Sequence, residues 1–478
     1  MKKNICCDVD AYKICHWKQL PPGITKLYSY GESRTGSRFP DVCFFGLNTI
    51  IKDHFMQSVT TEMIDEAEEE SFLTFGTKEY FNREVWERIR DIGYLPIRIK
   101  AVKEGSVIPI SNVLFTIEST EPWFALNVNS LETLLMHVWY PTTIATNSMY
   151  IHKDLKNIVE KSGSDFLLPF MCHDFSMRGV TCYEQGARGG AAHLIWFEGT
   201  DTMSANRLIR DYYGMKGRAK SVWATEHSVA TSFGPGRGEI EYVKHQLNNS
   251  PKEMIISIVA DSYDTFNFCK NVIGDPEIKQ MIIDRPGRVV IRPDSGDPQE
   301  VIVTCLHILE DVFGSSINDK GYKILNHNIG LLQGDGMKRE TIKDLYELIL
   351  SQNWSSDNLV VGSGGGLMQE GITRDTQRFA IKASYEEVNG KPFNVQKDPK
   401  TASFKKSKTG MLKLTCDREI DPRGIYQTIS STDKKFESAV DNLDVVFENG
   451  ILTRDQNFND IIKIAHASIV IDEESLVN

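Results

Sequence analysis

Four turns in the middle of the chain combine residue types that together could bind a phosphorylated sugar. The turns carry Asp261, Arg292, Asp294, Asp335 and the glycine run 364–366. Carboxylates accept hydrogen bonds from sugar hydroxyls or bind Mg²⁺, arginine binds phosphate, and the bare backbone N–H groups of glycines bind a second phosphate. This set of residue types therefore indicates a site for a phosphorylated sugar.

Each of these turns follows a short, continuous apolar run, which is typical of a strand covered on both faces. The runs are 254–260, 289–291, 329–332 and 359–361. The turns recur about every 30 to 40 residues, which is enough chain for a strand, a loop, a helix and a return loop. Because the loops after the carboxyl ends of parallel strands meet at one face, we predict a parallel sheet or barrel with its chemistry at that face.

Further motifs lie before and after this stretch. Phe175 and Arg178 are three residues apart, Asp201 follows the apolar run 192–197, and His227 follows a short strand-like piece. A basic series comes later in the chain: Arg374, Lys382, Lys397, Lys405 and Lys406. Taken singly, each motif has an ordinary structural explanation: a core aromatic, a helix cap, a structural histidine or a solvated loop. Their occurrence together with the four turns favours a functional explanation.

Composition excludes several classes of protein. The chain has 478 residues and a formal net charge of −11, which argues against general nucleic-acid binding. The nine cysteines are scattered and form no C-x-x-C, and the histidines show no metal-ligand spacing, so we expect a reduced, cytoplasmic compartment and neither a disulfide scaffold nor a zinc site. No apolar run approaches the ~18 residues of a membrane span, and the first residues lack the apolar core of a signal peptide.

The chain is long enough for two or three domains of ~100–200 residues. Alternating apolar residues at 96–102 and 113–117, and a hairpin signal at Asn449-Gly450, predict antiparallel strands near both ends. We therefore predict an α+β domain made of residues 1–160 together with 375–478, and an α/β barrel over 161–374 that begins after Ser162-Gly-Ser. The near match to a Walker A loop at 214–221 is a chance similarity, because Ala219 replaces its second glycine.

The motifs taken in order resemble those of the nicotinamide phosphoribosyltransferase family, and the resemblance covers nearly the whole chain. The matching blocks are Asp10-Ala-Tyr-Lys, His173-Asp-Phe, Arg178-Gly, Gly199-Thr-Asp-Thr, Glu226-His-Ser, Ser262-Tyr-Asp, Ile291-Arg-Pro-Asp-Ser-Gly, Gln333-Gly-Asp-Gly, Gly362-Ser-Gly-Gly-Gly-Leu, Thr373-Arg-Asp and Lys397-Asp-Pro. The resemblance implies the α/β fold of a type II phosphoribosyltransferase: an irregular α/β barrel beside an α+β domain formed by both chain ends. It also implies a homodimer with two active sites at the interface.

The resemblance implies transfer of phosphoribosyl from phosphoribosyl pyrophosphate to nicotinamide, with Mg²⁺ as cofactor and ATP hydrolysed through a phosphohistidine. The ring would stack between Phe175 and Tyr12 of the partner subunit, while Asp201 accepts from the carboxamide. His227 is the expected phosphorylated residue, and Glu226 and Asp261 are candidate orienting or Mg²⁺-supporting carboxylates.

The remaining candidates would hold the sugar and its phosphates. Asp294 and Asp335 suit the ribose hydroxyls, and Arg292 suits pyrophosphate or the amide oxygen. By the same resemblance, the other phosphate-binding candidates are Gly334, Gly364, Gly365, Arg178, Arg34, Lys397 and Lys405 together with Arg374 and Lys382 of the partner subunit.

The sequence departs from the family pattern at three places. Ser176-Met177 replaces the more usual Gly-Tyr, Glu370-Gly371 stands where one Lys is common, and the loop after Arg34 is shortened. The alternative enzyme is a nicotinate phosphoribosyltransferase, against which Asp201 argues because an anionic acceptor repels a carboxylate substrate. A catalytically silent binding protein is disfavoured, since it would not need His227, Asp294 and the glycine run together.

Overall fold

The computed structural model describes residues 3–400, 406–417 and 424–474, and the chain divides into two compact units. The first, here called the antiparallel unit, comprises Met1–Thr146, Ile209–Met215 and Ile372–Asn478. The second, here called the parallel unit, comprises Asn147–Leu208 and Lys216–Gly371. Each unit is described by itself below.

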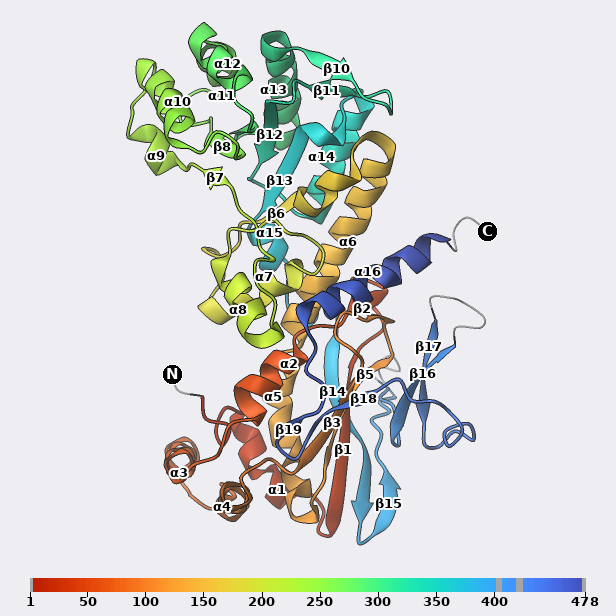
Figure 1. The fold of residues 1–478 in the computed structure, drawn as a ribbon. Helices are drawn as coiled ribbons and strands as arrows, with labels where there is room; N and C mark the ends of the chain where they lie inside the picture. The colour runs from red at the N-terminus through yellow and green to blue at the C-terminus, as the bar shows by residue number, and fades with distance from the viewer. Residues whose placement is uncertain (1–2, 401–405, 418–423, 475–478) are drawn as a thin grey trace. The chain divides into compact units, whose positions relative to one another are not determined.

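The parallel unit contains a six-stranded sheet in which every neighbouring pair is parallel (Figure 1). In sheet order the strands are β6 (Cys172–Asp174), β13 (Leu359–Ser363), β12 (Ile329–Gln333), β9 (Val289–Arg292), β8 (Ile256–Val259) and β7 (Trp223–Ala224). Isolated parallel bridges join Asp174 to Thr200 and Gly199 to Lys220, which lies just before β7. These bridges continue the pairing from β6 back toward β7, so the irregular α/β barrel expected from the sequence is confirmed.

Helices connect the parallel strands in the manner that the spacing of the turns predicts. They are α10 (Arg237–Asn249), α11 (Thr265–Asn267), α12 (Pro276–Ile283), α13 (Pro298–Phe313) and α14 (Arg339–Ser351), and the short α15 (Gly365–Met368) follows β13. Helix α13 begins where the Asp297 side chain accepts hydrogen bonds from the N–H groups of Gln299 and Glu300. Its buried residues, among them Ile302, Leu306 and Leu309, recur at the helical period and face the sheet.

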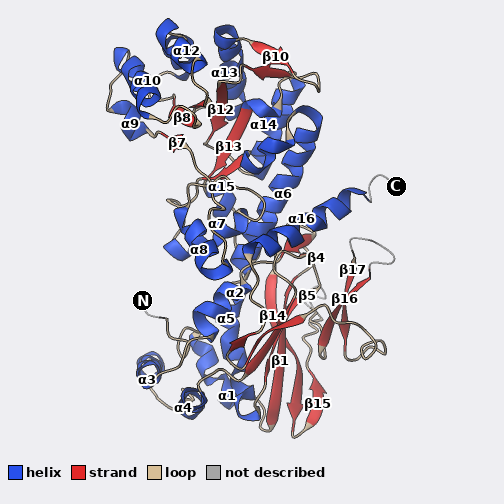
Figure 2. Cartoon of the chain, viewed as in Figure 1, coloured by secondary structure: helices blue, strands red, loops and turns tan. Residues whose placement is uncertain are grey.

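The antiparallel unit is built on a seven-stranded sheet that combines strands from both ends of the chain (Figure 2). In sheet order they are β15 (Lys391–Asn394), β14 (Phe379–Val388), β1 (Ile24–Ser33), β5 (Val113–Ser119), β3 (Ile97–Ala101), β18 (Asp444–Glu448) and β19 (Ile451–Leu452). The hairpin predicted at Asn449-Gly450 joins β18 to β19, and both turn residues have positive φ, as a type I′ turn requires.

Smaller elements complete both units. They are η1 (Ala11–Cys15), α1 (His16–Gln19), β2 (Asp41–Cys43), α2 (Leu47–Ile50), η2 (Ile51–Phe55), α3 (Thr61–Phe75), α4 (Arg83–Ile92), β4 (Val107–Pro109), η3 (Pro122–Leu131), α5 (Glu132–Met136), α6 (Trp139–Ser162), η4 (Asp165–Phe170), α7 (Tyr183–His193), α8 (Met203–Tyr213), α9 (His227–Thr231), η5 (Phe268–Val272), β10 (Ser315–Ile317), β11 (Lys323–Leu325), η6 (Ser356–Asn358), β16 (Leu412–Asp417), β17 (Ile425–Ser430) and α16 (Phe458–Glu474). Within the described ranges, no helix combines the length and apolarity needed to cross a membrane.

The division into units differs in detail from the predicted boundary at residue 160. The boundary lies inside α6, because the first turns of this helix bond to the antiparallel unit: the Thr142 and Thr146 hydroxyls accept from the N–H groups of Phe45 and Cys43. The end of α8 also groups with that unit, since the ring of Tyr213 stacks on Phe45 at 5.3 Å. The Ser162-Gly-Ser turn ends α6 without separating the units.

Candidate active site

Two cavities lie at the carboxyl ends of the parallel strands. The first has a volume of about 630 Å³ and is lined by Phe175, Met177, Arg178, Asp201, Ala224, Thr225, Glu226, His227, Ser228 and Arg292. The second, of about 400 Å³, is lined by Phe175, Ser176, Arg178, Gly179, Arg292, Asp294, Gly334, Asp335, Gly336, Met337, Gly364, Gly365, Gly366 and Glu370. The two share Phe175, Arg178 and Arg292, so the predicted residues of the parallel unit form one continuous site.

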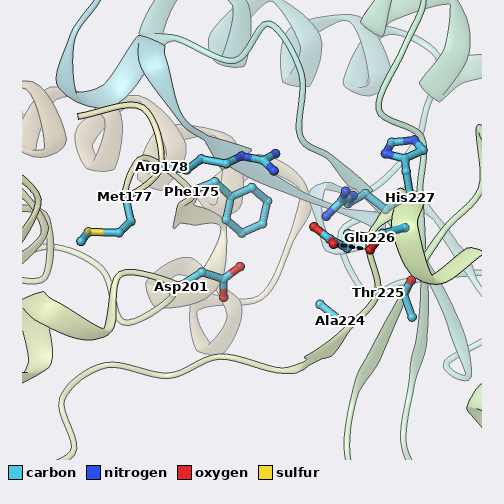
Figure 3. Close-up of a pocket in the computed structure, with 10 residues that line it drawn as sticks. Phe175, Met177, Arg178, Asp201, Ala224, Thr225, Glu226 and His227 are labelled. Atoms are coloured by element: carbon cyan, nitrogen blue, oxygen red, sulfur yellow. Dashed lines mark hydrogen bonds between the residues drawn. The ribbon is translucent and has the colours of Figure 1, made fainter. Parts of the chain in front are cut away.

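An aromatic ring and a carboxylate lie together at one side of the first cavity (Figure 3). Phe175 follows β6, and its N–H donates to the carbonyl of Ser363 at 2.9 Å. Its ring lies so close to β13 that a Cβ at Gly362 would be 2.0 Å from Cε2. Asp201 is exposed, and its Oδ1 accepts from the Ser221 hydroxyl at 2.5 Å. This side of the cavity offers a ring face and a hydrogen-bond acceptor.

His227 and Glu226 line the other side of the first cavity (Figure 3), and the buried Asp261 lies behind the histidine. His227 begins α9, and its Nε2 lies 2.9 Å from Oδ1 of Asp261. The Asp261 side chain is 4% exposed while that of His227 is 45% exposed, so a buried anion holds an accessible imidazole. With the proton on Nε2, the lone pair is on Nδ1 and available to an electrophile. The neighbouring Glu226 accepts a hydrogen bond from the Ser228 hydroxyl.

The second cavity combines carboxylates with bare backbone. Arg292 Nη2 lies 3.3 Å from Asp294 Oδ2. Burial raises the pKa of Asp294; the Arg292 guanidinium opposes this increase, and the charges of Asp261 and Asp335 add to it. At Gly334 a Cβ would lie 2.8 Å from Asp294 Oδ1, so any larger residue there would displace the Asp294 carboxylate. The second cavity can therefore bind a ligand that carries both, with its hydroxyl groups on the carboxylates and its phosphate on the peptide N–H groups.

The carboxylates of the site do not form a metal cluster by themselves. In the part of the chain that the structure describes, no group of three or more His, Cys, Asp or Glu side chains is arranged to hold a metal ion.

A third cavity, of about 570 Å³, lies in the antiparallel unit and gathers cations. It is lined by Arg34, Thr35, Glu132, Met136, Arg374, Asp375, Arg378, Phe379, Ala380 and Lys382. Lys382 is on β14 and pairs with Tyr30 of the neighbouring strand β1, and Arg34 directly follows the last residue of β1. Burial lowers the pKa of Lys382, and the nearby Glu132 carboxylate opposes that effect. Arg374 and Lys382, predicted to bind one phosphate together, thus line the same cavity as Arg34.

The structure does not gather the other predicted residues in these cavities. Tyr12 is on η1 in the antiparallel unit, where its side chain is 59% exposed. Lys397 is exposed, and its carbonyl accepts from the N–H of Ser407 at 2.9 Å. Lys405 lies outside the described residues.

Sequence reasoning missed several lining residues. Met177, Thr225 and Ser228 adjoin predicted residues, and their place in the motifs was a usable signal. Arg378, which also lines the third cavity, had no such signal; its backbone φ is positive, and its guanidinium would lie 2.9 Å from a Cβ at Gly36. At the departure noted above, Glu370 lines the second cavity and pairs with Lys338 at 2.6 Å.

Solved structures with this fold define the class of protein. Nicotinate-nucleotide pyrophosphorylase from Pyrococcus furiosus superposes with a TM-score of 0.61 at 13% identity, over 98% of this chain and 97% of that one. Human nicotinic acid phosphoribosyltransferase gives a TM-score of 0.55 at 13% identity, over 96% and 93%. The fold, with its polar loops at the strand ends, is that of a type II phosphoribosyltransferase.

Sequence comparison then narrows the class. Residues 170–451 match the model of the nicotinate phosphoribosyltransferase (NAPRTase) family, and residues 4–99 match the nicotinamide phosphoribosyltransferase N-terminal domain. The nicotinamide phosphoribosyltransferase of Xanthomonas campestris is 39% identical over 97% of this chain and 98% of its own. That of Acinetobacter baylyi is 30% identical over 95% of each. The chain therefore belongs to the nicotinamide phosphoribosyltransferase family and is an enzyme.

Proposed function

We propose that this enzyme transfers phosphoribosyl from 5-phosphoribosyl 1-pyrophosphate to nicotinamide, giving nicotinamide mononucleotide and pyrophosphate in NAD salvage. One observation carries the choice of acceptor: the Asp201 carboxylate lies in the same cavity as the Phe175 ring. A carboxylate accepts a hydrogen bond from the carboxamide NH₂ of nicotinamide, whereas it repels the carboxylate of nicotinate. The relatives named above support the same acceptor.

The second cavity suits the phosphoribosyl donor. In the reaction the pyridine nitrogen attacks the anomeric carbon as pyrophosphate leaves, and positive charge develops on the sugar. Asp294 and Asp335 would hold the ribose hydroxyls and offset that charge, while Arg292 binds the departing pyrophosphate. Backbone N–H groups at Gly364 and Gly365 would take the 5′-phosphate.

We further propose that ATP phosphorylates His227. Asp261 holds Nε2, which leaves Nδ1 to attack the γ-phosphorus of ATP while the bond to the β,γ-bridging oxygen breaks and ADP leaves. The same carboxylate stabilises the imidazole once it carries the phosphate. Arg178 lines both cavities and would bind the phosphates of ATP or of the donor. Mg²⁺ binds through one or two carboxylates plus substrate phosphates, a requirement that Asp261 and Asp294 fit, and it would neutralise phosphate charge there.

The site is proposed to be completed by a second copy of the chain. The cavity with Arg34, Arg374 and Lys382 offers positive charges that would bind a phosphate. Tyr12, which is 59% exposed, offers an aromatic ring that would stack on the second face of the nicotinamide ring. Both belong to the antiparallel unit. In an isologous homodimer, each subunit would receive these groups from its neighbour.

The alternative acceptor is nicotinate, which the names of the structural neighbours favour. Incubation with phosphoribosyl pyrophosphate, Mg²⁺ and either base, with and without ATP, separates the two. We expect nicotinamide mononucleotide as the main product and ATP to increase its yield. Preference for nicotinate would overturn the role given to Asp201, and no product from either base would overturn the proposed reaction.

A further inference from the structure

Asp174 is a buried carboxylate that lines neither cavity of the parallel unit. It is the last residue of β6 and is 0% exposed. Its Oδ1 accepts from the Ser176 N–H at 2.9 Å and from the Ser176 hydroxyl at 2.5 Å, and its Oδ2 accepts from the Thr200 hydroxyl at 3.1 Å. A carboxylate without water must find such donors in the protein, so these three bonds determine where Asp174 lies.

The backbone of Asp174 joins the two residues proposed to bind the base. Phe175 follows it directly, and the Asp201 N–H donates to the Asp174 carbonyl at 2.9 Å. Toward the same segment, the Asp174 N–H donates to the Gly199 carbonyl at 3.1 Å. The side-chain bond to Thr200 adds a third link between the same two segments. The separation of the Phe175 ring from the Asp201 carboxylate therefore depends on Asp174.

Ser176 extends this arrangement toward the second cavity. It is 1% exposed, and its Oγ lies 2.8 Å from the sulfur of Met368, on the helix α15 that begins in the glycine run. A glycine at this position would have no hydroxyl to donate, so the short bond from Ser176 to Asp174 depends on the serine side chain.

We propose that Asp174 and Ser176 are positioning residues that hold Phe175 and Asp201 at the separation a nicotinamide ring requires, and so set the selectivity for the base. The inference rests on the proposed function, in which this cavity binds the base. Asp174 lines neither cavity, and Ser176, which borders the second, is 1% exposed and directs its hydroxyl to Asp174, so each acts through its neighbours. Without the Asp174 and Ser176 hydrogen bonds, the distance between the Phe175 ring and the Asp201 carboxylate is no longer fixed. Binding of the base is then weakened more than the chemical step is slowed.

The test compares Ser176→Ala, Ser176→Gly and Asp174→Asn with Ser162→Ala. Ser162 is the matched control, a fully buried serine of the same unit whose hydroxyl donates to the Ile158 carbonyl at 3.1 Å. We expect the Ser176 variants to raise the KM for nicotinamide about fivefold, and Asp174→Asn to raise it tenfold or more, as for loss of hydrogen bonds to a charged group. The KM for phosphoribosyl pyrophosphate and kcat should stay within about twofold, and the preference for nicotinamide over nicotinate should narrow.

The double variant tests whether Ser176 acts through Asp174. If it does, Ser176→Ala adds little to Asp174→Asn, whereas two full, additive effects would overturn the proposal. An unchanged KM and base preference in folded Ser176→Ala would also overturn it, and this variant suffices if Asp174→Asn fails to fold. Failure of the proposed function is distinct, since wild-type enzyme would then form no product from nicotinamide.

Discussion

The parallel and antiparallel units present opposite kinds of polar group at their cavities. In the parallel unit the loops after short, buried strands place the carboxylates Asp201, Asp294 and Asp335 beside bare glycine backbone. In the antiparallel unit the longer strand β14 and the segment before it place Arg374, Arg378 and Lys382 around one cavity, together with Arg34 at the end of β1. Of these four cations, Lys382 is within β14, whereas Arg34, Arg374 and Arg378 lie in the turns just outside the strands.

Because the two kinds of cavity carry different charges, neither kind alone suits the whole of the donor, phosphoribosyl pyrophosphate. Ribose hydroxyls need acceptors, and a carbohydrate cation in the transition state needs negative charge, which the parallel unit supplies. Phosphate needs cations, of which the parallel unit's cavities contain only Arg178 and Arg292. The two regions are therefore complementary in charge, and the predictions below test whether they are complementary in function.

The largest effect is expected from removing one charged group of each unit. Asp294→Ala and Arg374→Ala should each reduce kcat/KM about 10- to 100-fold or more, as expected when a charged partner of the donor is lost. Arg90→Ala is the control, because Arg90 is on α4 and pairs with Asp91 outside the cavities. Steady-state rates at varied phosphoribosyl pyrophosphate measure the loss.

Mixing these two weakened variants tests whether the site is shared between subunits. After subunit exchange, each heterodimer would have one site with both lesions and one site with neither. Half of the dimers are then heterodimers, so recovered activity should approach about a quarter of wild type. No recovery, with exchange shown by mass spectrometry, would place Arg374 and Asp294 in the site of one subunit.

Next in size is the effect of His227 on ATP. His227→Ala should abolish ATP hydrolysis while leaving slow, ATP-independent synthesis, because the donor and base sites remain intact. Wild-type enzyme incubated with ATP and Mg²⁺ should acquire acid-labile phosphate on His227, mapped by mass spectrometry. His307→Ala serves as control, since His307 is an exposed histidine of α13 in the same unit. If ATP still increased the rate of synthesis by His227→Ala as much as that of wild type, His227 would not be the phosphorylated residue.

A smaller effect is expected for the choice of base. Asp201→Asn removes the charge that repels nicotinate and weakens one charge-assisted hydrogen bond, so the ratio of kcat/KM values should move toward nicotinate by about 10- to 100-fold. Asp211→Asn, an exposed aspartate of α8 that pairs with Arg210, is the matched control. Equal ratios in Asp201→Asn and wild type would remove Asp201 from base recognition.

The smallest effect is one on stability. Burial raises the pKa of Asp294 in the folded state, so folded protein binds this proton more tightly than unfolded protein. Protonated Asp294 therefore contributes to the free energy of unfolding. This contribution is fully present below the pKa of Asp294 in the unfolded state, and it is lost as the pH rises through its pKa in the folded state. At pH 7 Asp294→Asn should therefore melt about 1–3 °C higher than wild type, a difference that disappears below about pH 4. A lower Tm for Asp294→Asn at pH 7, with the exposed Asp211→Asn of α8 as control, would contradict this sign.

Local patterns in the sequence identified the parts of the fold that depend on local physics. The apolar runs became β8, β9, β12 and β13, since a strand covered on both faces must be apolar throughout. The Asn449-Gly450 turn was predicted because few other pairs adopt positive φ at both positions. The turn residues formed one site for the same reason, as carboxyl ends of parallel strands share an edge.

By itself, then, the sequence determined the parallel strands, the turns between them and the residue types at their ends, because these follow from periodicity and backbone preference within a few residues. Only the tertiary structure decided the irregular closure of the ring through Gly199, Thr200 and Lys220, and the gathering of Arg34 with Lys382 across paired strands. It also decided that α6 crosses the boundary between units. Such pairings join residues distant in the chain, and their free energy depends on packing that no local window contains.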